Sequence, residues 1–322
     1  MPNPSRRLAV LAALGAGACW GVSFLAPRAL GETPSSAIAL FRFLFFGISS
    51  VAALALRRAQ RPRMSRAAWG SAIGLSGAGY SLYYFLLAVG VKGIGVPFAT
   101  AIISLLPLTI LLASTPLREW SRLALPIVLI AVGGVLVPIE LFGPAYAALL
   151  ARTPLERMVG LFATLGALAL WTAFAIRNAR FLVANPEWKP LDWAGALGVA
   201  SAGTATLLFL VAARSEASAI FLAALGDPRV LLWTGFMGVA GGWLSSALWN
   251  VASRSLPPSA LGMLLVFEAI FGLTFGFLYE GRGPTAREGA AAVCLIAGAL
   301  IGIRILGRPN DRSTSADRAR AG

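Results

Sequence analysis

The chain has 322 residues, of which 58% are hydrophobic and only 12% charged, and its mean hydropathy is +0.78. This composition excludes a soluble globular domain and indicates a protein that crosses a membrane several times. The net charge of +14 would suggest nucleic-acid binding in a soluble protein. Here the arginines lie mostly between apolar runs, where the positive-inside bias explains them, so we expect no nucleic-acid partner.

Ten apolar stretches are each predicted to cross the lipid bilayer as a helix, because about 20 apolar residues at 1.5 Å rise span its hydrocarbon core. They are residues 8–27, 35–56, 69–91, 94–115, 121–139, 156–176, 191–213, 230–252, 259–279 and 287–306. The connection 214–229 contains the sequence SAIFLAALG, which is predicted to form a short interfacial helix. The tail from 307 to 322 is polar and basic, and we expect it to be disordered.

The distribution of basic residues predicts the orientation of the chain. Of the 27 lysines and arginines, 18 fall on one side of the predicted spans, eight on the other and one, Arg42, within a span. The richer side is expected to be the cytoplasm, so both termini are predicted to lie inside, as an even number of spans requires.

The two halves of the chain share sequence features in the same order. Three pairs of positions correspond: Trp20 with Trp171, Trp69 with Trp233, and Glu119 with Glu280. Each half has five spans, so the halves, 1–140 and 141–306, are predicted to enter the membrane in opposite senses, as in many secondary transporters. Shared composition of two unrelated apolar halves is the alternative.

A family resemblance rests on this pattern together with Arg42-Phe43 in span 2, Pro107 in span 4 and a glutamate closing spans 4 and 9. The chain resembles the EamA-type drug/metabolite transporter superfamily and, within it, most closely the YddG-type exporters of aromatic amino acids. The resemblance implies an all-α membrane protein of ten helices around a central cavity, with spans 5 and 10 peripheral. It also implies a bacterial inner-membrane location and a working monomer.

Glu268 is the charged residue at the midpoint of span 259–279. A carboxylate there costs about 3 kcal/mol on insertion scales unless it faces water, a partner or a cavity. Three interpretations stay open: a protonated group hydrogen-bonded in packing, a ligand for a substrate ammonium group, or the carrier of a coupling proton. When the halves are aligned on Glu119 and Glu280, Glu268 corresponds to Pro107, so the halves differ chemically at this point.

Aromatic residues well inside the spans predict the lining of a cavity. A mid-membrane indole or phenol needs a partner for its polar hydrogen, which favours a bundle interior over lipid. The candidates are Trp20, Phe24, Tyr80, Tyr84, Trp171 and Trp243. Plain packing is the alternative for each of them.

Polar residues in spans 4 and 8 are the next candidates. Trp243, Ser246 and Asn250 are spaced i, i+3 and i+7, one helical stripe that could bind an amino acid's carboxylate or ammonium group or could join helices. Ser104 lies one turn before Pro107, and prolines there free a backbone carbonyl four residues earlier.

Three residues are assigned a structural or gating role. Pro97 and Pro107 suggest a hinge or a cavity wall, with simple kinking as the alternative. Arg42 lies about 10 Å from the outer end of span 2, where it either snorkels outward or faces the bundle.

The absence of histidine removes the commonest catalytic base and zinc ligand. Cys19 and Cys294 fall inside apolar runs and are expected to pack there. We therefore expect no cofactor and no metal, and no enzyme, because an intramembrane enzyme would need a clustered acid, base and nucleophile.

The function predicted is export of amino acids, aromatic and other apolar ones, and related amphipathic metabolites by alternating access. A carrier for organic cations is the alternative, since a cation would use Glu268 and the aromatic rings together.

Overall fold

A computed structural model describes residues 5–23, 29–30, 33–57, 64–136, 152–281 and 283–306. All the regular structure within these ranges is helical. Eight helical stretches among the described residues are long and apolar enough to cross a membrane. They are Ser36–Leu56, Arg66–Ile94, Leu117–Leu136, Pro154–Ala184, Pro190–Leu225, Pro228–Ser255, Pro258–Tyr279 and Ala286–Leu306. The prediction of an all-helical, multi-pass membrane protein is therefore confirmed.

Two further helices are shorter than these eight. They are α1 (Arg6–Ser23) and α6 (Leu106–Ser114). The other elements of the N-terminal part are α3 (Ser35–Leu56), α4 (Arg66–Ser76), η1 (Gly77–Leu82), α5 (Tyr83–Ile103), η2 (Leu117–Leu123) and α7 (Ala124–Leu136). The C-terminal part contains α9 (Pro154–Ala184), α10 (Pro190–Ala213), η4 (Arg214–Glu216), α11 (Ala217–Leu225), α12 (Pro228–Gly238), η5 (Val239–Leu244), α13 (Ser245–Ser255), α14 (Pro258–Glu280) and α15 (Ala286–Leu306).

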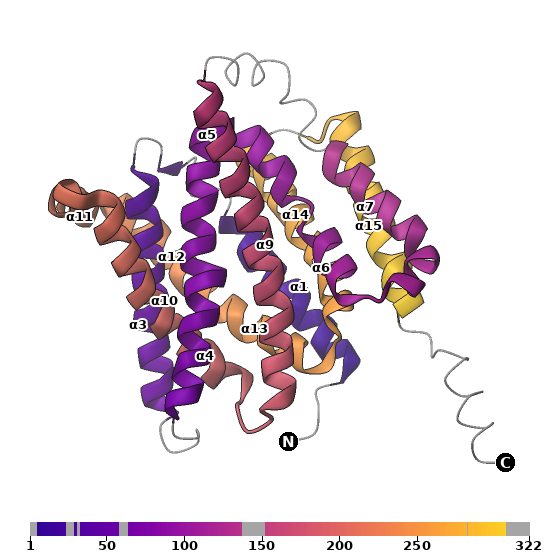
Figure 1. Ribbon diagram of the computed structural model, residues 1–322, viewed down its shortest axis with the longest axis horizontal. Helices are drawn as coiled ribbons and strands as arrows, with labels where there is room; N and C mark the ends of the chain where they lie inside the picture. The colour runs from indigo at the N-terminus through magenta and orange to yellow at the C-terminus, as the bar shows by residue number, and fades with distance from the viewer. Residues whose placement is uncertain are drawn as a thin grey trace.

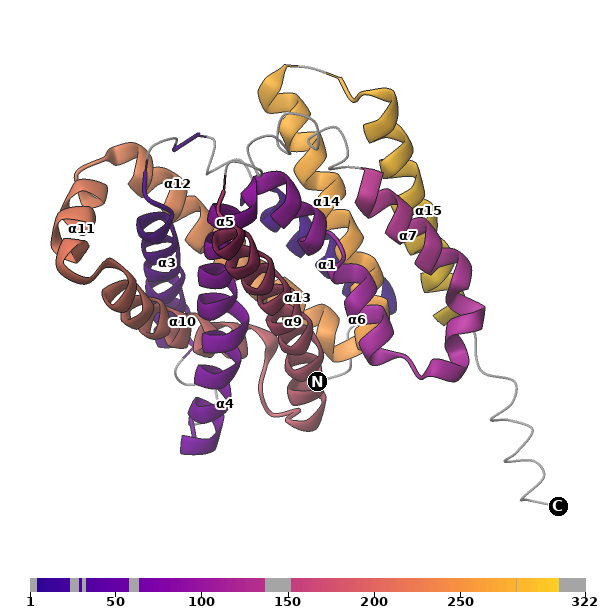
Figure 2. The ribbon, with the colours of Figure 1, turned by 45° about the horizontal axis from the view of Figure 1, so that its top comes forward.

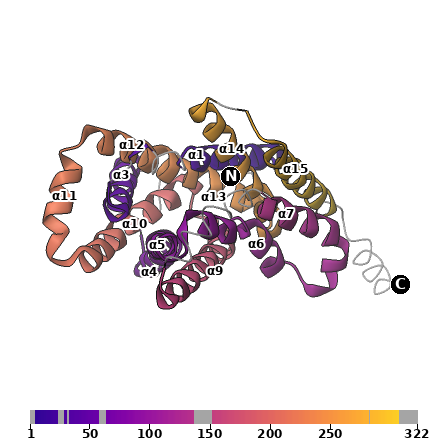
Figure 3. The ribbon, with the colours of Figure 1, turned by 90° about the horizontal axis from the view of Figure 1, so that it is seen from above.

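Helices from the two parts of the chain alternate in space. Helix α3 packs on α10, α5 on α9, and α1 on both α13 and α14. Helices α7 and α15 lie side by side at one edge of the molecule, and α11 lies at the opposite edge (Figures 1 and 3). The view in Figure 2 places α1, α13 and α9 between these two edges. The core is therefore built jointly by both parts.

Small residues allow the helices to approach closely. A Cβ on Gly160 of α9 would lie 2.7 Å from the Cα of Gly93 in α5, and one on Gly21 of α1 would lie 2.8 Å from the backbone nitrogen of Gly272 in α14. Such contacts supply the van der Waals packing that joins helices in lipid, where no hydrophobic force acts between them.

Local sequence fixes several helix ends. Thr153 and Glu156 form a capping box at the start of α9, because each side chain accepts the backbone N–H of the other residue. Gly281 ends α14 in a left-handed conformation with φ of 64°, which glycine adopts without steric cost.

The predicted boundary between spans 3 and 4, at residues 92–93, is wrong. Helix α5 continues to Ile103, and the helical run is interrupted only at Ser104 and Leu105. Gly93 does not act as a turn residue there, because it serves the close contact with Gly160. Pro107 stands in the first turn of α6, where its missing N–H has no helical partner to lose, so it begins a helix and does not kink one.

The structure adds two elements without a sequence signal: η1 and η5 are π-helical segments within the α4–α5 and α12–α13 helices. The predicted helix in 214–229 is confirmed as α11. Phe24, the predicted domain boundary at 140–141 and the tail 307–322 lie outside the described residues.

Candidate functional site

An aromatic cluster occupies the middle of the helix bundle. The ring centroids of Trp20 in α1 and Trp171 in α9 are 5.8 Å apart, with an interplanar angle of 78°. Trp249 of α13 lies 5.4 Å from Trp20 on another side. All three side chains are buried. Edge-to-face ring pairs of this kind are favoured by the ring quadrupoles, so the cluster joins three helices at its centre.

Tyr80 extends this cluster to η1. Its ring centroid lies 5.7 Å from that of Trp171 and 4.8 Å from that of Phe174. Its phenol oxygen is 2.9 Å from the hydroxyl oxygen of Ser246, the second residue of α13. The predicted candidates Trp20, Trp171, Tyr80 and Ser246 are therefore brought together. The polar hydrogen of the phenol finds a partner, as a buried tyrosine requires.

The indole of Trp20 also finds its partner in the other half of the chain. Its Nε1 donates a hydrogen bond of 3.0 Å to the carbonyl of Gly241 in η5. The same carbonyl accepts from the hydroxyl of Ser245 at 2.7 Å. A π-helical turn shifts the backbone hydrogen-bond register, which leaves carbonyls able to accept from side chains. The π-helical segment η5 is thus tied to α1.

Arg42 of α3 lies beside the cluster. Its guanidinium carbon is 5.7 Å from the ring centroid of Phe43 and 5.8 Å from that of Tyr84 in α5, both within cation–π range. Its Nε is buried and has no hydrogen-bond partner in the described part of the chain. The side chain is half-buried and faces the bundle, so the inward interpretation holds and snorkelling into lipid does not.

Glu268 of α14 is half-buried and lies within electrostatic range of Arg42 and Tyr83. No hydrogen bond or ion pair joins its carboxylate to any described residue, and neither oxygen is among the enclosed atoms that lack a partner. The carboxylate therefore faces open space. On the other side of this helix, a Cβ on Gly17 would lie 3.3 Å from the backbone nitrogen of Glu268, so α1 supports α14 at this depth.

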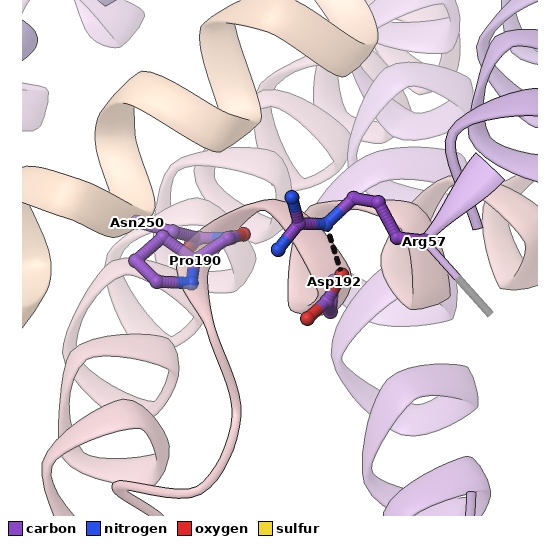
Figure 4. Close-up of polar contacts among 4 residues, drawn as sticks. All are labelled: Arg57, Pro190, Asp192 and Asn250. Atoms are coloured by element: carbon purple, nitrogen blue, oxygen red, sulfur yellow. Dashed lines mark hydrogen bonds and ion pairs between the residues drawn. The ribbon is translucent and has the colours of Figure 1, made fainter. Parts of the chain in front are cut away.

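Asn250 lies apart from the aromatic cluster, in a buried polar network. The side-chain amide of Asn178 in α9 donates to Asn250 Oδ1 at 2.9 Å, and the indole of Trp193 donates to Asn178 Oδ1 at 2.8 Å. Asn250 itself donates to the carbonyl of Pro190 at 3.3 Å (Figure 4). The amide thus joins α9, α10 and α13.

The predicted stripe of Trp243, Ser246 and Asn250 therefore does not meet at one point. The spacing assumed a continuous α-helix, but Trp243 belongs to the wider π-helical turn of η5, which changes the register of the residues around it. The Nε1 of Trp243 is buried and without a partner among the described residues.

An ion pair that sequence reasoning missed lies next to this network. Arg57 Nε is 2.7 Å from Asp192 Oδ1, and Asp192 is fully buried while Arg57 remains 27% exposed (Figure 4). The pair joins the end of α3 to the start of α10. Its sequence signal was weak, because Asp192 resembles an ordinary acidic residue in the first turn of a helix.

The remaining candidates lie elsewhere. The Ser104 hydroxyl donates to the carbonyl of Gly134 at 3.0 Å and so connects to α7. The side chain of Pro97 is outside the described part of the structure, and Pro107 packs at the crossing of α6 with Gly262 of α14. In the described ranges, no three His, Cys, Asp or Glu side chains gather in a group that could hold a metal ion.

The helices and their buried aromatic and charged residues define a multi-pass membrane protein with a polar site inside its bundle. The EamA-like transporter family matches residues 7–139. Inner membrane protein YtfF of Escherichia coli (strain K12) is 30% identical over 307 residues, which cover 92% of this chain and 94% of that protein. The chain belongs to the EamA-like transporter family and is a membrane transporter.

A solved structure, titled as the crystal structure of a protein, has the same fold. Its TM-score is 0.72 at 18% sequence identity, and the match covers 95% of this chain and all of that one. The resemblance to the drug/metabolite transporter superfamily is confirmed, while the narrower YddG-type assignment stays a prediction.

Proposed function

We propose that this transporter exports amino acids, preferring those with apolar or aromatic side chains. The observation that carries the proposal is the unpaired carboxylate of Glu268, which faces open space within electrostatic range of Arg42. An amino acid presents an ammonium group, a carboxylate and a side chain. Glu268 complements the first, the Arg42 guanidinium the second, and the rings of Tyr83, Tyr84 and Trp171 the third.

The electrostatics favour a zwitterion over a simple ion. A charge at mid-membrane depth is costly without a counter-charge. A bound amino acid would supply both: its ammonium group would neutralise Glu268, and its carboxylate could accept from the Nε of Arg42, which has no partner among the described residues. Charge-assisted hydrogen bonds of this kind are about twice as strong as neutral ones.

An inverted repeat would place this site between two halves of opposite sense. Trp20 and Trp171 correspond in the two halves of the sequence and contact each other at 5.8 Å. The π-helical segments also correspond, since Ala78-Gly79 and Ala240-Gly241 occupy the same positions in η1 and η5. Helices α7 and α15, the last of each half, pack together. Each feature pairs an element with its repeat equivalent, as a two-fold axis in the membrane plane predicts.

Alternating access gives these contacts a mechanical role. We take the ten spans to be the eight long helical stretches together with α1 and α6. π-Helical turns frequently occur at functional sites, because they break the regular backbone register. The Tyr80–Ser246 and Trp20–Gly241 hydrogen bonds join η1 and η5 to elements of the opposite half. Rocking of the halves would break or remake them.

The location and topology follow the same reasoning. The relative that covers most of the chain is named an inner membrane protein, which supports a bacterial inner-membrane location. Helix α1 begins and α15 ends towards the same end of the bundle (Figure 1), where Arg57, Arg180 and Arg254 also lie. The positive-inside rule makes this end cytoplasmic. We expect the monomer to be the working unit, because the site is built within one chain.

Transport by purified protein in liposomes tests the proposal. Counterflow of labelled phenylalanine is measured against three competitors: phenylalanine, phenethylamine, which lacks the carboxylate, and phenylpropionate, which lacks the ammonium group. We expect only the complete zwitterion to compete fully. Glu268→Gln should weaken phenylalanine binding at least about tenfold, because a hydrogen bond to a charged group is lost. Glu216→Gln, at an exposed glutamate of η4, is the matched control and should behave like the wild type.

The alternative, an organic-cation carrier, is favoured by the position of Glu268 beside aromatic rings. The charge of Arg42 opposes it, because a bare cation would be repelled at the same site. Full competition by phenethylamine, with no counterflow of phenylalanine, would replace the amino-acid proposal with this one.

A further inference from the structure

A groove outside the central site lies between the end of α9 and the junction of α13 with α14. Its volume is about 390 Å³. One wall is formed by residues 179, 180, 183 and 184 of α9, and the other by residues 253–258. The groove lies where an apolar membrane span ends. Such a depth corresponds to the headgroup region of a bilayer.

Two arginines place positive charge in this groove. Arg180 is exposed and Arg254 is half-buried. Both terminal nitrogens of Arg254 are held by backbone carbonyls: NH1 donates to Trp188 at 3.1 Å and NH2 to Pro186. Carbonyls fix the guanidinium but do not neutralise it. Within the described residues neither arginine forms an ion pair, so the groove keeps its net positive charge.

Two serine hydroxyls in the groove lack partners. Ser253 is fully buried, and its Oγ, like that of Ser255, has no hydrogen-bond partner in the described ranges. Serines and threonines elsewhere in these helices donate to the carbonyl four residues earlier, as Ser201 and Ser245 do. An enclosed hydroxyl without a partner is unfavourable. Both hydroxyls are therefore available to donate to a ligand oxygen.

The groove also includes the N-terminus of α14. Its N-cap, Pro257, offers no side-chain acceptor to the first-turn N–H groups, and the helix begins at Pro258. Free N–H groups and the helix dipole favour an anion at such an end. Together with the arginines and the hydroxyls, they make a donor set suited to phosphate oxygens.

The remaining wall is apolar and continues toward the lipid. Leu256 and the two prolines line the groove, and Val183 beside them is 66% exposed. A free phosphate ion would gain nothing from these side chains, whereas the acyl chains of a lipid could follow the surface of α9. A zwitterionic headgroup would bring its own cation against Arg180 and Arg254.

From these features we propose that the groove binds the phosphate of an anionic phospholipid. The arginines, the serine hydroxyls and the start of α14 hold the headgroup, and the acyl chains lie along α9 past Val183. Basic pockets between transmembrane helices bind anionic headgroups in this manner.

Native mass spectrometry and thermal unfolding of the full-length protein in detergent test the site. Phosphatidylglycerol, phosphatidylcholine and inorganic phosphate are added separately. We expect one phosphatidylglycerol to be retained per chain and to raise Tm, with no equivalent effect of the other two. Equal stabilisation by inorganic phosphate would show a site for the free ion, and equal retention of phosphatidylcholine would show annular lipid only. Either result overturns the proposal.

Two variants locate the lipid in the groove. Arg180→Gln should bind phosphatidylglycerol about fivefold more weakly, as expected for the loss of one interfacial arginine. Ser253→Ala should also weaken binding, while its Tm without lipid stays unchanged or rises, because an unpartnered hydroxyl is removed. Arg177→Gln is the matched control, since Arg177 is exposed on the same helix and does not line the groove. Equal binding by all three variants would contradict the proposal.

Discussion

The hydroxyl groups of Tyr80 and Ser246 lie 2.9 Å apart, although 166 positions separate them in the chain. Tyr80 belongs to the π-helical segment η1, and Ser246 follows directly on the π-helical segment η5. The only irregular turns described within these two long helices are therefore joined by one hydrogen bond at the centre of the bundle. The contact fixes α4–α5 against α12–α13.

A double-mutant cycle on Tyr80→Phe and Ser246→Ala measures this contact. Side-chain hydrogen bonds between membrane helices average about 0.6 kcal/mol, and we expect a coupling energy of that size. Each single variant should unfold at a lower temperature, and the double variant should lose little more than either one. Fully additive losses in thermal unfolding would show that the two hydroxyls do not interact.

The Arg57–Asp192 ion pair predicts a larger and asymmetric effect. Arg57→Ala leaves the fully buried carboxylate of Asp192 without its counter-charge, and breaking a buried pair in this way costs about 3–5 kcal/mol. The double variant Arg57→Ala/Asp192→Ala should be more stable than Arg57→Ala alone, because no buried charge remains.

Chemical denaturation in detergent compares these variants with Arg66→Ala. Arg66 is exposed at the start of α4, so its removal should change stability little. If Arg57→Ala unfolds at the same denaturant concentration as Arg66→Ala, the ion pair contributes nothing to the folded state.

The indole hydrogen bond of Trp20 predicts a change in transport that is separate from stability. Trp20→Phe keeps an aromatic ring but removes the donor to the Gly241 carbonyl in η5. Trp120→Phe is matched to it, because the indole of Trp120 donates to the Thr115 carbonyl at 3.2 Å at the edge of the bundle. Both variants lose one hydrogen bond to a backbone carbonyl, so we expect similar small losses of Tm.

Only Trp20→Phe should alter the rate of counterflow, since only this bond connects two elements that move relative to each other in the proposed cycle. Equal counterflow rates for the two variants in liposomes would separate the Trp20–Gly241 contact from the transport mechanism.

The centre of the site could be predicted because its chemistry restricts where the residues lie. Indoles and phenols at mid-membrane depth need polar partners, which placed Trp20, Trp171 and Tyr80 inside the bundle before their contacts were known. The recurrence of tryptophan in both halves correctly singled out Trp20 and Trp171, which do meet.

The rest depended on geometry that sequence spacing does not record. The stripe through Trp243, Ser246 and Asn250 was drawn on an α-helical register, and η5 changes that register. The ion pair between Arg57 and Asp192 joins residues 135 positions apart, and neither residue looks unusual in its own segment. Helix ends were equally misleading at Gly93, which serves close packing and does not terminate a helix.

The contact between Gly93 and Gly160 gives the last prediction. A Cβ on Gly160 would lie 2.7 Å from the Cα of Gly93 and 2.9 Å from its carbonyl carbon, so Gly160→Ala forces α9 away from α5. Overpacking of this kind costs about 1–3 kcal/mol. Gly70→Ala in α4 is the control, because nothing lies within 4 Å of its Cβ position and alanine is favoured over glycine in a helix by up to about 1 kcal/mol. Thermal unfolding should therefore move in opposite directions for the two variants. A Gly160→Ala protein as stable as the wild type would mean that α5 and α9 can separate without loss, and that this glycine contact does not hold the helices together.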